Sequence, residues 1–186
     1  MTGTTGALEW TPALSRPELV AAPVEKALSE LGADADEVAV AEIDPDLADT
    51  AAFCETYGVG LDISANCVVV AAKRSGGRDL AACVVLATTR ADVNGLVRRH
   101  LEARKVSFAP MDAAVAETGM EYGGITPIGL PAGWPLLVDQ AVDAADRVVV
   151  GSGVRRSKLL VPGPLLGRLP GAEVLEGLGQ PFTDHA

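Results

Sequence analysis

Residues 65–87 read ANCVVVAAKRSGGRDLAACVVLA, two apolar stretches on either side of a short polar segment. The stretches 67–72 and 80–87 are rich in β-branched and small apolar residues, which favour strands. Ser75-Gly76-Gly77 between them is a typical turn sequence. We therefore predict a β-hairpin, which places two neighbouring antiparallel strands in the sheet.

Helices and strands alternate irregularly around this hairpin. Ser15, Pro17 and Glu18 form a helix-start signature, and Gly32 is expected to end that helix. A second helix is expected from Asp49 or Thr50 to Gly58. Further strands are predicted at 38–43, 106–109, 135–138, 147–150, 158–161 and 172–175, and further helices at 92–103, 112–118 and 162–168. This pattern favours an α/β (α+β) fold, a single mixed β-sheet flanked by helices.

The chain length of 186 residues fits one domain. We assign residues 1–14 to a flexible lead-in, 15–177 to the domain and 178–186 to a loose tail. No apolar run reaches the roughly 18–20 residues of a membrane helix, and no signal-peptide pattern begins the chain. Three cysteines without CxxC spacing and only two histidines predict reduced thiols and no metal site. We expect a cytoplasmic protein.

The net charge of −10 is unevenly distributed. Residues 1–62 hold 13 acidic and 2 basic residues, whereas residues 63–186 hold 12 acidic and 13 basic ones. Two basic clusters lie in the second part: Arg98, Arg99, Arg104 and Lys105, then Arg155, Arg156 and Lys158. They are either solvated surface or a face that binds phosphates. Neither cluster has interleaved aromatic residues, so stacking of a single strand is not indicated.

The segment 123–131, GGITPIGLP, contains three glycines and two prolines. It is neither a helix nor a central strand. Glycine lets the backbone approach a ligand closely and proline stiffens that approach, so the segment is a candidate binding loop. The alternative is an ordinary surface loop.

The segment 148–156, VVVGSGVRR, leads from an apolar strand into a Gly-Ser-Gly turn and two arginines. It is either a small anion-binding nest or a tight turn with exposed arginines. It lacks the GK[ST] of a phosphate-binding loop, and a strand instead of a helix follows, which excludes a dinucleotide fingerprint.

Four motifs together resemble the YbaK/EbsC group of aminoacyl-tRNA editing domains, the free-standing or prolyl-tRNA-synthetase-associated deacylases. They are Thr50 with the helix end Tyr57-Gly58-Val59, the hairpin from Ala65 to Leu86, the loop from Gly123 to Gly129, and Val150-Gly151-Ser152-Gly153 followed by arginine. The resemblance covers about residues 16 to 176.

The resemblance implies one domain with a barrel-like sheet that hydrolyses the ester between a wrong amino acid and the 3′ end of tRNA. It implies no metal and no other cofactor. The pocket is expected between the glycine–proline loop and the first hairpin strand. The implied substrate-binding residues are Thr50, Gly123, Gly124, Ile125, Thr126, Pro127, Gly129, Gly151, Ser152 and Gly153.

One position departs from the family pattern. Most members carry a lysine needed for activity where this chain has Asn66. Asparagine donates hydrogen bonds but carries no charge, and losing one stabiliser of a developing oxyanion typically lowers the rate by roughly 10²–10³. Lys158 or Arg155 could supply the missing charge, so Asn66 and Lys158 are the candidate catalytic residues.

Three functions stay open at this point. The first is an active trans-editing deacylase, whose expected tRNA contacts are Arg98, Arg99, Arg104, Lys105, Arg155 and Arg156, with a synthetase as a second candidate partner. The second is an inactive relative that binds an aminoacyl or nucleoside-like ligand or a protein. The third is unrelated chemistry on the same fold.

Overall fold

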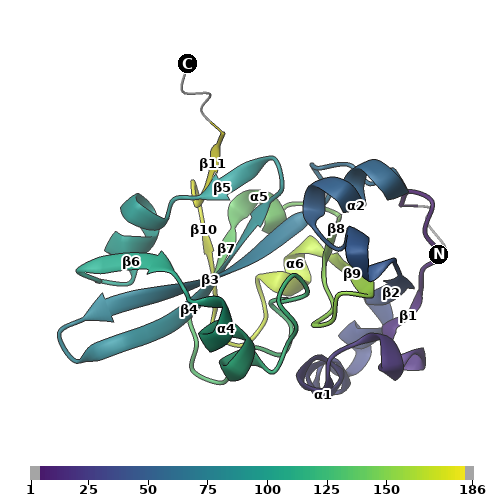
Figure 1. The fold of residues 1–186 in the computed structure, drawn as a ribbon, viewed down its shortest axis with the longest axis horizontal. Coiled ribbons are helices and arrows are strands. Elements are labelled where there is room, and N and C mark those ends of the chain that lie inside the picture. The colour runs from purple at the N-terminus through teal and green to yellow at the C-terminus, as the bar shows by residue number, and fades with distance from the viewer. Residues whose placement is uncertain (1–4, 183–186) are drawn as a thin grey trace.

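The computed structural model describes residues 5–182, and its longest strands form the predicted hairpin (Figure 1). β3 (Ala65–Arg74) and β4 (Gly77–Leu86) pair antiparallel along their whole length. They belong to a five-stranded sheet of order β10-β7-β4-β3-β6. Its other strands are β6 (Lys105–Phe108), β7 (Leu136–Asp139) and β10 (Ala172–Leu175). β6 pairs with residues 70–73 of β3, and the Ala109 amide donates to the Val69 carbonyl at 2.9 Å, so within the described residues only 65–68 lack a ladder partner on this side and form a free strand edge.

A second sheet has four strands in the order β1-β2-β9-β8. They are β1 (Thr11–Pro12), β2 (Ala39–Glu42), β8 (Arg147–Gly151) and β9 (Ser157–Pro162). It meets the first sheet at the start of β3, where Ser64 bridges Val149 and the Val149 amide donates to the Ile63 carbonyl at 2.7 Å. β5 (Thr89–Ala91) and β11 (Gly179–Pro181) form a third, two-stranded sheet.

The predicted mixed α/β class is thus confirmed, but the strands of residues 5–182 divide among three sheets and form no closed barrel. The expectation of a single barrel-like sheet is corrected here. The physical reason lies at the junction, where one isolated bridge replaces a full ladder between β3 and β8. The two larger sheets therefore meet at an angle and leave the edge of β3 open.

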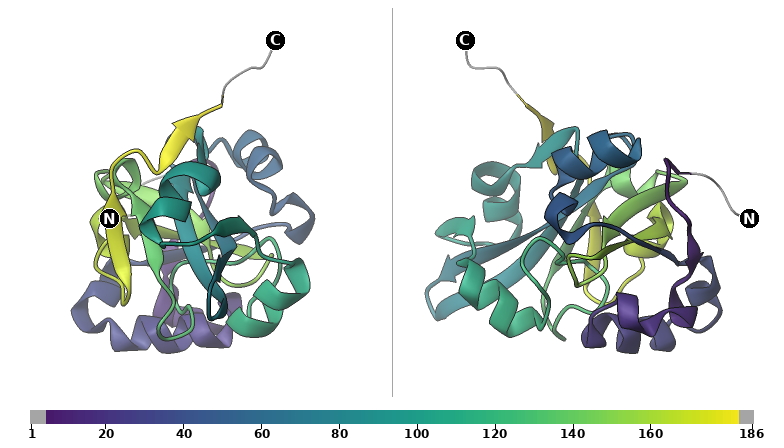
Figure 2. Two further views of the ribbon diagram at one scale, coloured as in Figure 1. Left: turned by 90° about the vertical axis from the view of Figure 1, so that its left-hand side faces the viewer. Right: turned by 45° about the vertical axis from the view of Figure 1, so that its right-hand side comes forward.

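Helical segments pack on both sides of the sheets (Figure 2). Residues 22–30, 140–143 and 163–166 contribute to the main core between the two larger sheets, whereas residues 93–97 pack on the other face of the five-stranded sheet and residues 50–57 on the other face of the four-stranded sheet. The α-helices are α1 (Ala22–Glu30), α2 (Thr50–Tyr57), α3 (Arg98–His100), α4 (Met111–Thr118), α5 (Gln140–Asp143) and α6 (Gly163–Leu166). Short 3₁₀ turns lie at Ala13–Ser15, Pro17–Leu19, Gly32–Glu37 and Pro45–Leu47, and a π-helical turn, η5, at Val93–Val97. α2 ends as predicted at Gly58, whose φ of 67° is left-handed.

The first helix begins at Ala22 and not at Ser15. The Ser15 hydroxyl donates back to the Pro12 carbonyl and caps no helix, because two 3₁₀ turns intervene. Pro23 takes the first-turn position that we had assigned to Pro17.

Both predicted loose ends pack partly on the domain. Leu8 and Trp10 are buried, and β1 pairs with β2. At the other end, Leu178 is fully buried and β11 pairs with β5. The lead-in and tail therefore contribute to the core and to two sheets at residues 8–12 and 178–181. Residues 1–4 and 183–186 of these segments lie outside the described residues.

Candidate functional site

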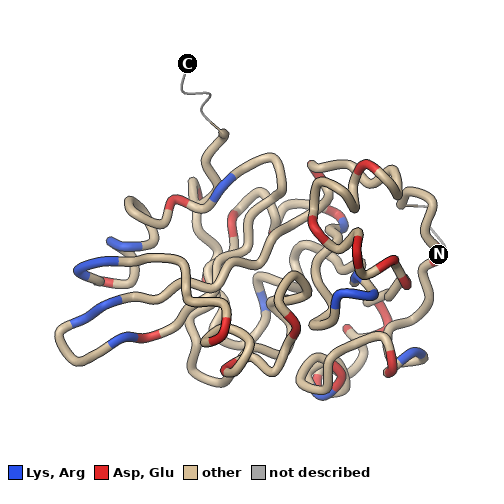
Figure 3. The backbone as a smooth tube through the Cα atoms, in the orientation of Figure 1, with Lys and Arg blue, Asp and Glu red and all other residues tan. Residues whose placement is uncertain are grey.

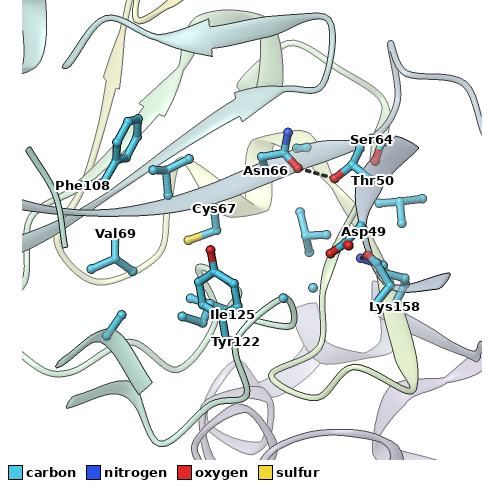
Figure 4. Close-up of a pocket in the computed structure, with 18 of the residues that line it drawn as sticks. Asp49, Thr50, Ser64, Asn66, Cys67, Val69, Phe108, Tyr122, Ile125 and Lys158 are labelled. Carbon is cyan, nitrogen blue, oxygen red and sulfur yellow. Dashed lines mark hydrogen bonds between the residues drawn. The ribbon is translucent and has the colours of Figure 1, made fainter. Parts of the chain in front are cut away.

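A cavity of about 320 Å³ opens along the free edge of β3, where the two larger sheets part (Figure 4). One wall is β3 itself, and the others come from the start of α2, the glycine–proline loop, and the ends of β8 and β9. Both Asn66 and the loop therefore face one hollow, which is the arrangement expected from the sequence. The predicted site residues that line it are Thr50, Asn66, Gly123, Ile125, Gly151 and Lys158.

Asn66 is half-buried and is held by the first residue of α2. The Thr50 hydroxyl donates to Asn66 Oδ1 at 2.6 Å (Figure 4). This bond fixes which end of the amide accepts, so the two N–H groups of Asn66 stay available as donors. The helix start that the sequence placed at Thr50 thus orients the predicted catalytic amide.

Lys158 is the buried cation of the cavity, with 8% of its surface exposed. Its Nζ donates to the Ala48 carbonyl at 2.8 Å and lies 5.2 Å from the centre of the Phe53 ring. Burial lowers the pKa of Lys158 to about 8, against the opposing effect of Cys54 and Asp49. An ammonium has three N–H donors, so Lys158 can hold its backbone partner and still donate into the cavity.

Cys67 also lines the cavity, but it is not a ready nucleophile. Burial raises the pKa of the Cys67 thiol far above its ordinary value. A thiol needs a lowered pKa to attack at neutral pH, so this one stays protonated. The predicted reading of Cys67 as an apolar core residue fits this environment.

The remaining glycines of the two motifs pack against protein backbone and do not line the cavity. A Cβ on Gly124 would come within 2.7 Å of Val154, and one on Gly129 within 2.5 Å of the Pro23 carbonyl oxygen. Gly153 has a φ of +87°, and its Cβ would meet Ala21 at 2.4 Å. Gly129 and Gly153 thus allow the loops to approach α1 and the residue before it, and Gly124 allows the glycine–proline loop to approach Val154.

Three other predicted binding residues are buried away from the cavity. Ser152 is fully buried and shares a 2.7 Å hydrogen bond with the Ser157 hydroxyl. Pro127 and Thr126 are buried as well. The Thr126 hydroxyl has no hydrogen-bond partner among the described residues.

The two basic clusters have different surroundings (Figure 3). The Arg155 guanidinium donates to the Pro45 carbonyl at 3.0 and 3.2 Å and lies 3.7 Å from an Asp49 carboxylate oxygen, and Arg156 donates to the Glu18 carbonyl. This pair fastens the acidic N-terminal third to the loops. In the other cluster, Arg104 and Lys105 lie beside the hairpin end of β3, since the Arg104 amide donates to the Lys73 carbonyl at 2.9 Å and Lys105 pairs with Lys73, and Arg98 and Arg99 belong to α3.

Besides several apolar residues, sequence reasoning missed four polar or aromatic side chains of the cavity: Asp49, Ser64, Phe108 and Tyr122. Phe108 and Tyr122 are 67% and 57% exposed at its mouth. Phe108 follows Lys105 by three residues, so an aromatic near a cation was the signal that could have identified it.

The described residues contain no group of three or more His, Cys, Asp or Glu side chains placed to hold a metal ion. Within residues 5–182, no helix has the length and apolar character needed to cross a membrane.

Comparison with known proteins places this geometry in a family. The model of the aminoacyl-tRNA editing domain matches residues 44–169, well over half of the chain. Among curated proteins, none matches the sequence.

Three solved structures share the fold at low sequence identity. A proposed trans-editing enzyme for prolyl tRNA synthetase is 20% identical with a TM-score of 0.71, covering 85% of this chain and 95% of that one. A scaffold protein used for computational epitope grafting is 22% identical (TM-score 0.72, 86% and 97% coverage). A hypothetical protein is 21% identical with a TM-score of 0.72, covering 85% of this chain and 99% of that one. The chain belongs to the aminoacyl-tRNA editing domain family.

Proposed function

We propose that the protein is an aminoacyl-tRNA deacylase that hydrolyses the ester of a mischarged aminoacyl-tRNA in trans. The observation that carries the proposal is the cavity at the edge of β3, which the Asn66 amide and the buried Lys158 ammonium both line. Membership of the editing-domain family supplies the substrate class. A cytoplasmic location and a synthetase partner accord with this role.

The reaction needs little beyond positioning and charge stabilisation. Water, oriented by the neighbouring ribose hydroxyl of the substrate, adds to the aminoacyl carbonyl carbon, and the carbonyl oxygen becomes an oxyanion. The carbon–oxygen bond to the ribose then breaks, and the ribose oxygen takes up the proton that water gives up. Asn66 N–H and Lys158 Nζ are the donors available to stabilise the oxyanion.

Lys158 takes over the charge that Asn66 lacks. It reaches the cavity from β9 and not from β3, so the cation approaches from a different wall than in most of the family. Its low exposure matters because a charge away from water acts more strongly on a developing oxyanion. At pH 7 its pKa of about 8 keeps most molecules charged.

The four cations Arg98, Arg99, Arg104 and Lys105 are proposed to contact tRNA phosphates. Each neutralised phosphate releases counterions, so tRNA affinity should fall steeply as salt rises. Replacing all four by Gln should reduce the slope of log Kd against log salt by about 3. Replacing Arg155 and Arg156 should change it less, because both donate to backbone carbonyls. An unchanged slope in the fourfold variant would identify that cluster as solvated surface.

A deacylation assay over a panel of mischarged tRNAs tests the central proposal. We expect amino-acid release above the uncatalysed rate for at least one pair, and a loss of roughly 10²–10³ in Asn66→Ala, typical of removing one oxyanion donor. No release from any pair would overturn the proposal.

The alternative, a binding protein without hydrolysis, is favoured by one observation. Asn66 Oδ1 and Lys158 Nζ already hold internal partners, Thr50 and Ala48. Asn66→Lys separates the two functions, because it restores the usual cation. If the wild type is inert and this variant hydrolyses the ester, the alternative holds.

A further inference from the structure

A second hollow of about 550 Å³ adjoins the candidate active site and has no part in the chemistry described so far. It lies between β5, η5, β6 and β11. Its lining residues of interest are Arg90, Asn94, Lys105, Ser107, Phe108 and Gln180.

Phe108 is the residue that both hollows share. It pairs with Val70 in the β3–β6 ladder. Directly paired residues point to the same face of a sheet, and so do residues four apart on one strand. Asn66 lies four residues before Val70 and therefore points to the same face as Phe108. The exposed ring therefore stands on the Asn66 side of the sheet, at the boundary between the candidate active site and the second hollow.

The second hollow combines three kinds of group that suit a nucleotide. Phe108 offers an aromatic face that is 67% exposed. Lys105, three residues before Phe108, leaves β6 on the opposite face of the sheet, and it brings its positive charge to the hollow around the edge of this outermost strand. No carboxylate of the described residues forms an ion pair with it. The side chains of Asn94 and Ser107 add hydrogen-bonding groups.

Two further lining side chains are already partly engaged. Gln180 donates to the Gly177 carbonyl at 2.8 Å, which leaves its side-chain oxygen as an acceptor. The single carboxylate of the lining, Asp92, accepts from the Gly95 and Leu96 amides at 3.0 and 2.8 Å. Its charge is thus partly compensated at the start of η5.

We infer that this second hollow binds the nucleotide that precedes the aminoacylated terminal adenosine of an RNA 3′ end. Phe108 stacks on a base, and Lys105 lies near the connecting phosphate. The inference rests on the proposed function, since the ester in the first cavity fixes which end of the RNA enters. The direction agrees with the charge, because further cations adjoin Lys105: it pairs with Lys73, whose carbonyl accepts from the Arg104 amide.

Adenosine 5′-monophosphate and the dinucleotide cytidylyl-(3′→5′)-adenosine test the inference in direct binding to the full chain. Both carry the adenosine and a 5′-phosphate, and the dinucleotide adds the preceding nucleoside. Its phosphodiester has less negative charge than the phosphate monoester, so tighter binding of the dinucleotide beside Lys105 comes from the nucleoside and not from charge. Stacking on an aromatic side chain predicts that the dinucleotide binds about 5- to 100-fold more tightly. Isothermal titration calorimetry measures both affinities without any need for hydrolysis.

Variants at Phe108 and Met111 make the test specific. Phe108→Ala should remove most of the dinucleotide advantage, and Phe108→Trp should retain it, because the aromatic face is kept. Met111→Ala is the matched control, since Met111 is 55% exposed, lies three residues along the chain and lines neither hollow. It should bind both probes as the wild type does.

The outcomes separate this inference from the proposed function. Two results would overturn the nucleotide site in the second hollow, even if mischarged tRNA is hydrolysed. One is a dinucleotide that binds no more tightly than the mononucleotide, and the other is a dinucleotide advantage that Phe108→Ala retains. A Phe108-dependent advantage in a protein that releases no amino acid upholds the nucleotide site and overturns the deacylase.

Discussion

The two walls of the candidate active site are built in different ways. On one side, β3 and β9 present side chains with chemistry of their own, Asn66 and Lys158. On the other, the glycine–proline loop presents mostly backbone and the side chain of Ile125. Half-buried Asn66 is oriented by Thr50 and buried Lys158 by Ala48, whereas Gly129 is held through close contact with the Pro23 carbonyl.

Polar side chains and glycines therefore have different roles in the site, although both belong to its sequence motifs. The side-chain wall holds the polar groups that can respond to charge in the substrate. In the loop wall, Gly129 lets the backbone approach α1 and Gly124 lets it approach Val154, so these two glycines place the wall, whereas Gly123 lines the cavity. Substitutions on the two walls should therefore affect different measurements, hydrolysis for the first and stability for the second.

The largest effect is expected at Lys158. Lys158→Met keeps the volume and removes the charge, and we expect kcat/KM for deacylation to fall by roughly 10²–10³. Removing a buried charge removes its desolvation cost, but it also removes the hydrogen bond to the buried Ala48 carbonyl, so the two effects oppose each other and Tm should change little. Steady-state kinetics and thermal unfolding test both parts. A variant with wild-type activity would show that the cation of this wall has no role in the reaction.

The pH dependence of Lys158 sharpens that test. Burial lowers its pKa to about 8, so the ammonium is present below this pH and is lost as the pH rises through it. Hydroxide attack on the ester rises over the same range in all samples. We therefore expect the ratio of wild-type to Lys158→Met rates to be constant below pH 7 and to decline above pH 8. A ratio independent of pH would contradict a role for the charge.

The side-chain wall was easier to predict from the sequence than the loop wall. The hairpin, α2 and its end at Gly58 were predictable because periodicity and turn residues act locally. Asn66, Thr50 and Lys158 could be chosen by matching motifs, and all three line the cavity.

Other features depend on contacts between distant segments. Gly129 approaches Pro23 across 106 positions of sequence, and no local pattern distinguishes such a glycine from one that faces a ligand. The same limit applies to the division into three sheets, which depends on the single bridge between Ser64 and Val149. It also applies to Phe108, which joins two hollows only in the folded chain.

A smaller effect, on stability, is expected from Gly129→Ala. Gly129 has a φ of +89°, and an added Cβ would lie 2.5 Å from the Pro23 backbone oxygen, which cannot move aside as a flexible side chain can. We expect a loss of about 1–3 kcal/mol in the free energy of unfolding, measured with denaturant. The kcat of the folded protein should change little, because Gly129 does not line the cavity.

Gly133→Ala is the matched control for this loop wall. Gly133 has a similar φ of +85°, yet no atom lies within 4 Å of its added Cβ, so the variant carries the backbone strain without the clash. The difference between the two variants then measures the close approach of the loop to α1. If Gly129→Ala destabilises the protein no more than Gly133→Ala, the close approach to α1 imposes no requirement for glycine, and Gly129 is needed only for its positive φ. If Gly129→Ala instead abolishes hydrolysis at full stability, the loop wall acts on the substrate directly, and the division between the two walls fails.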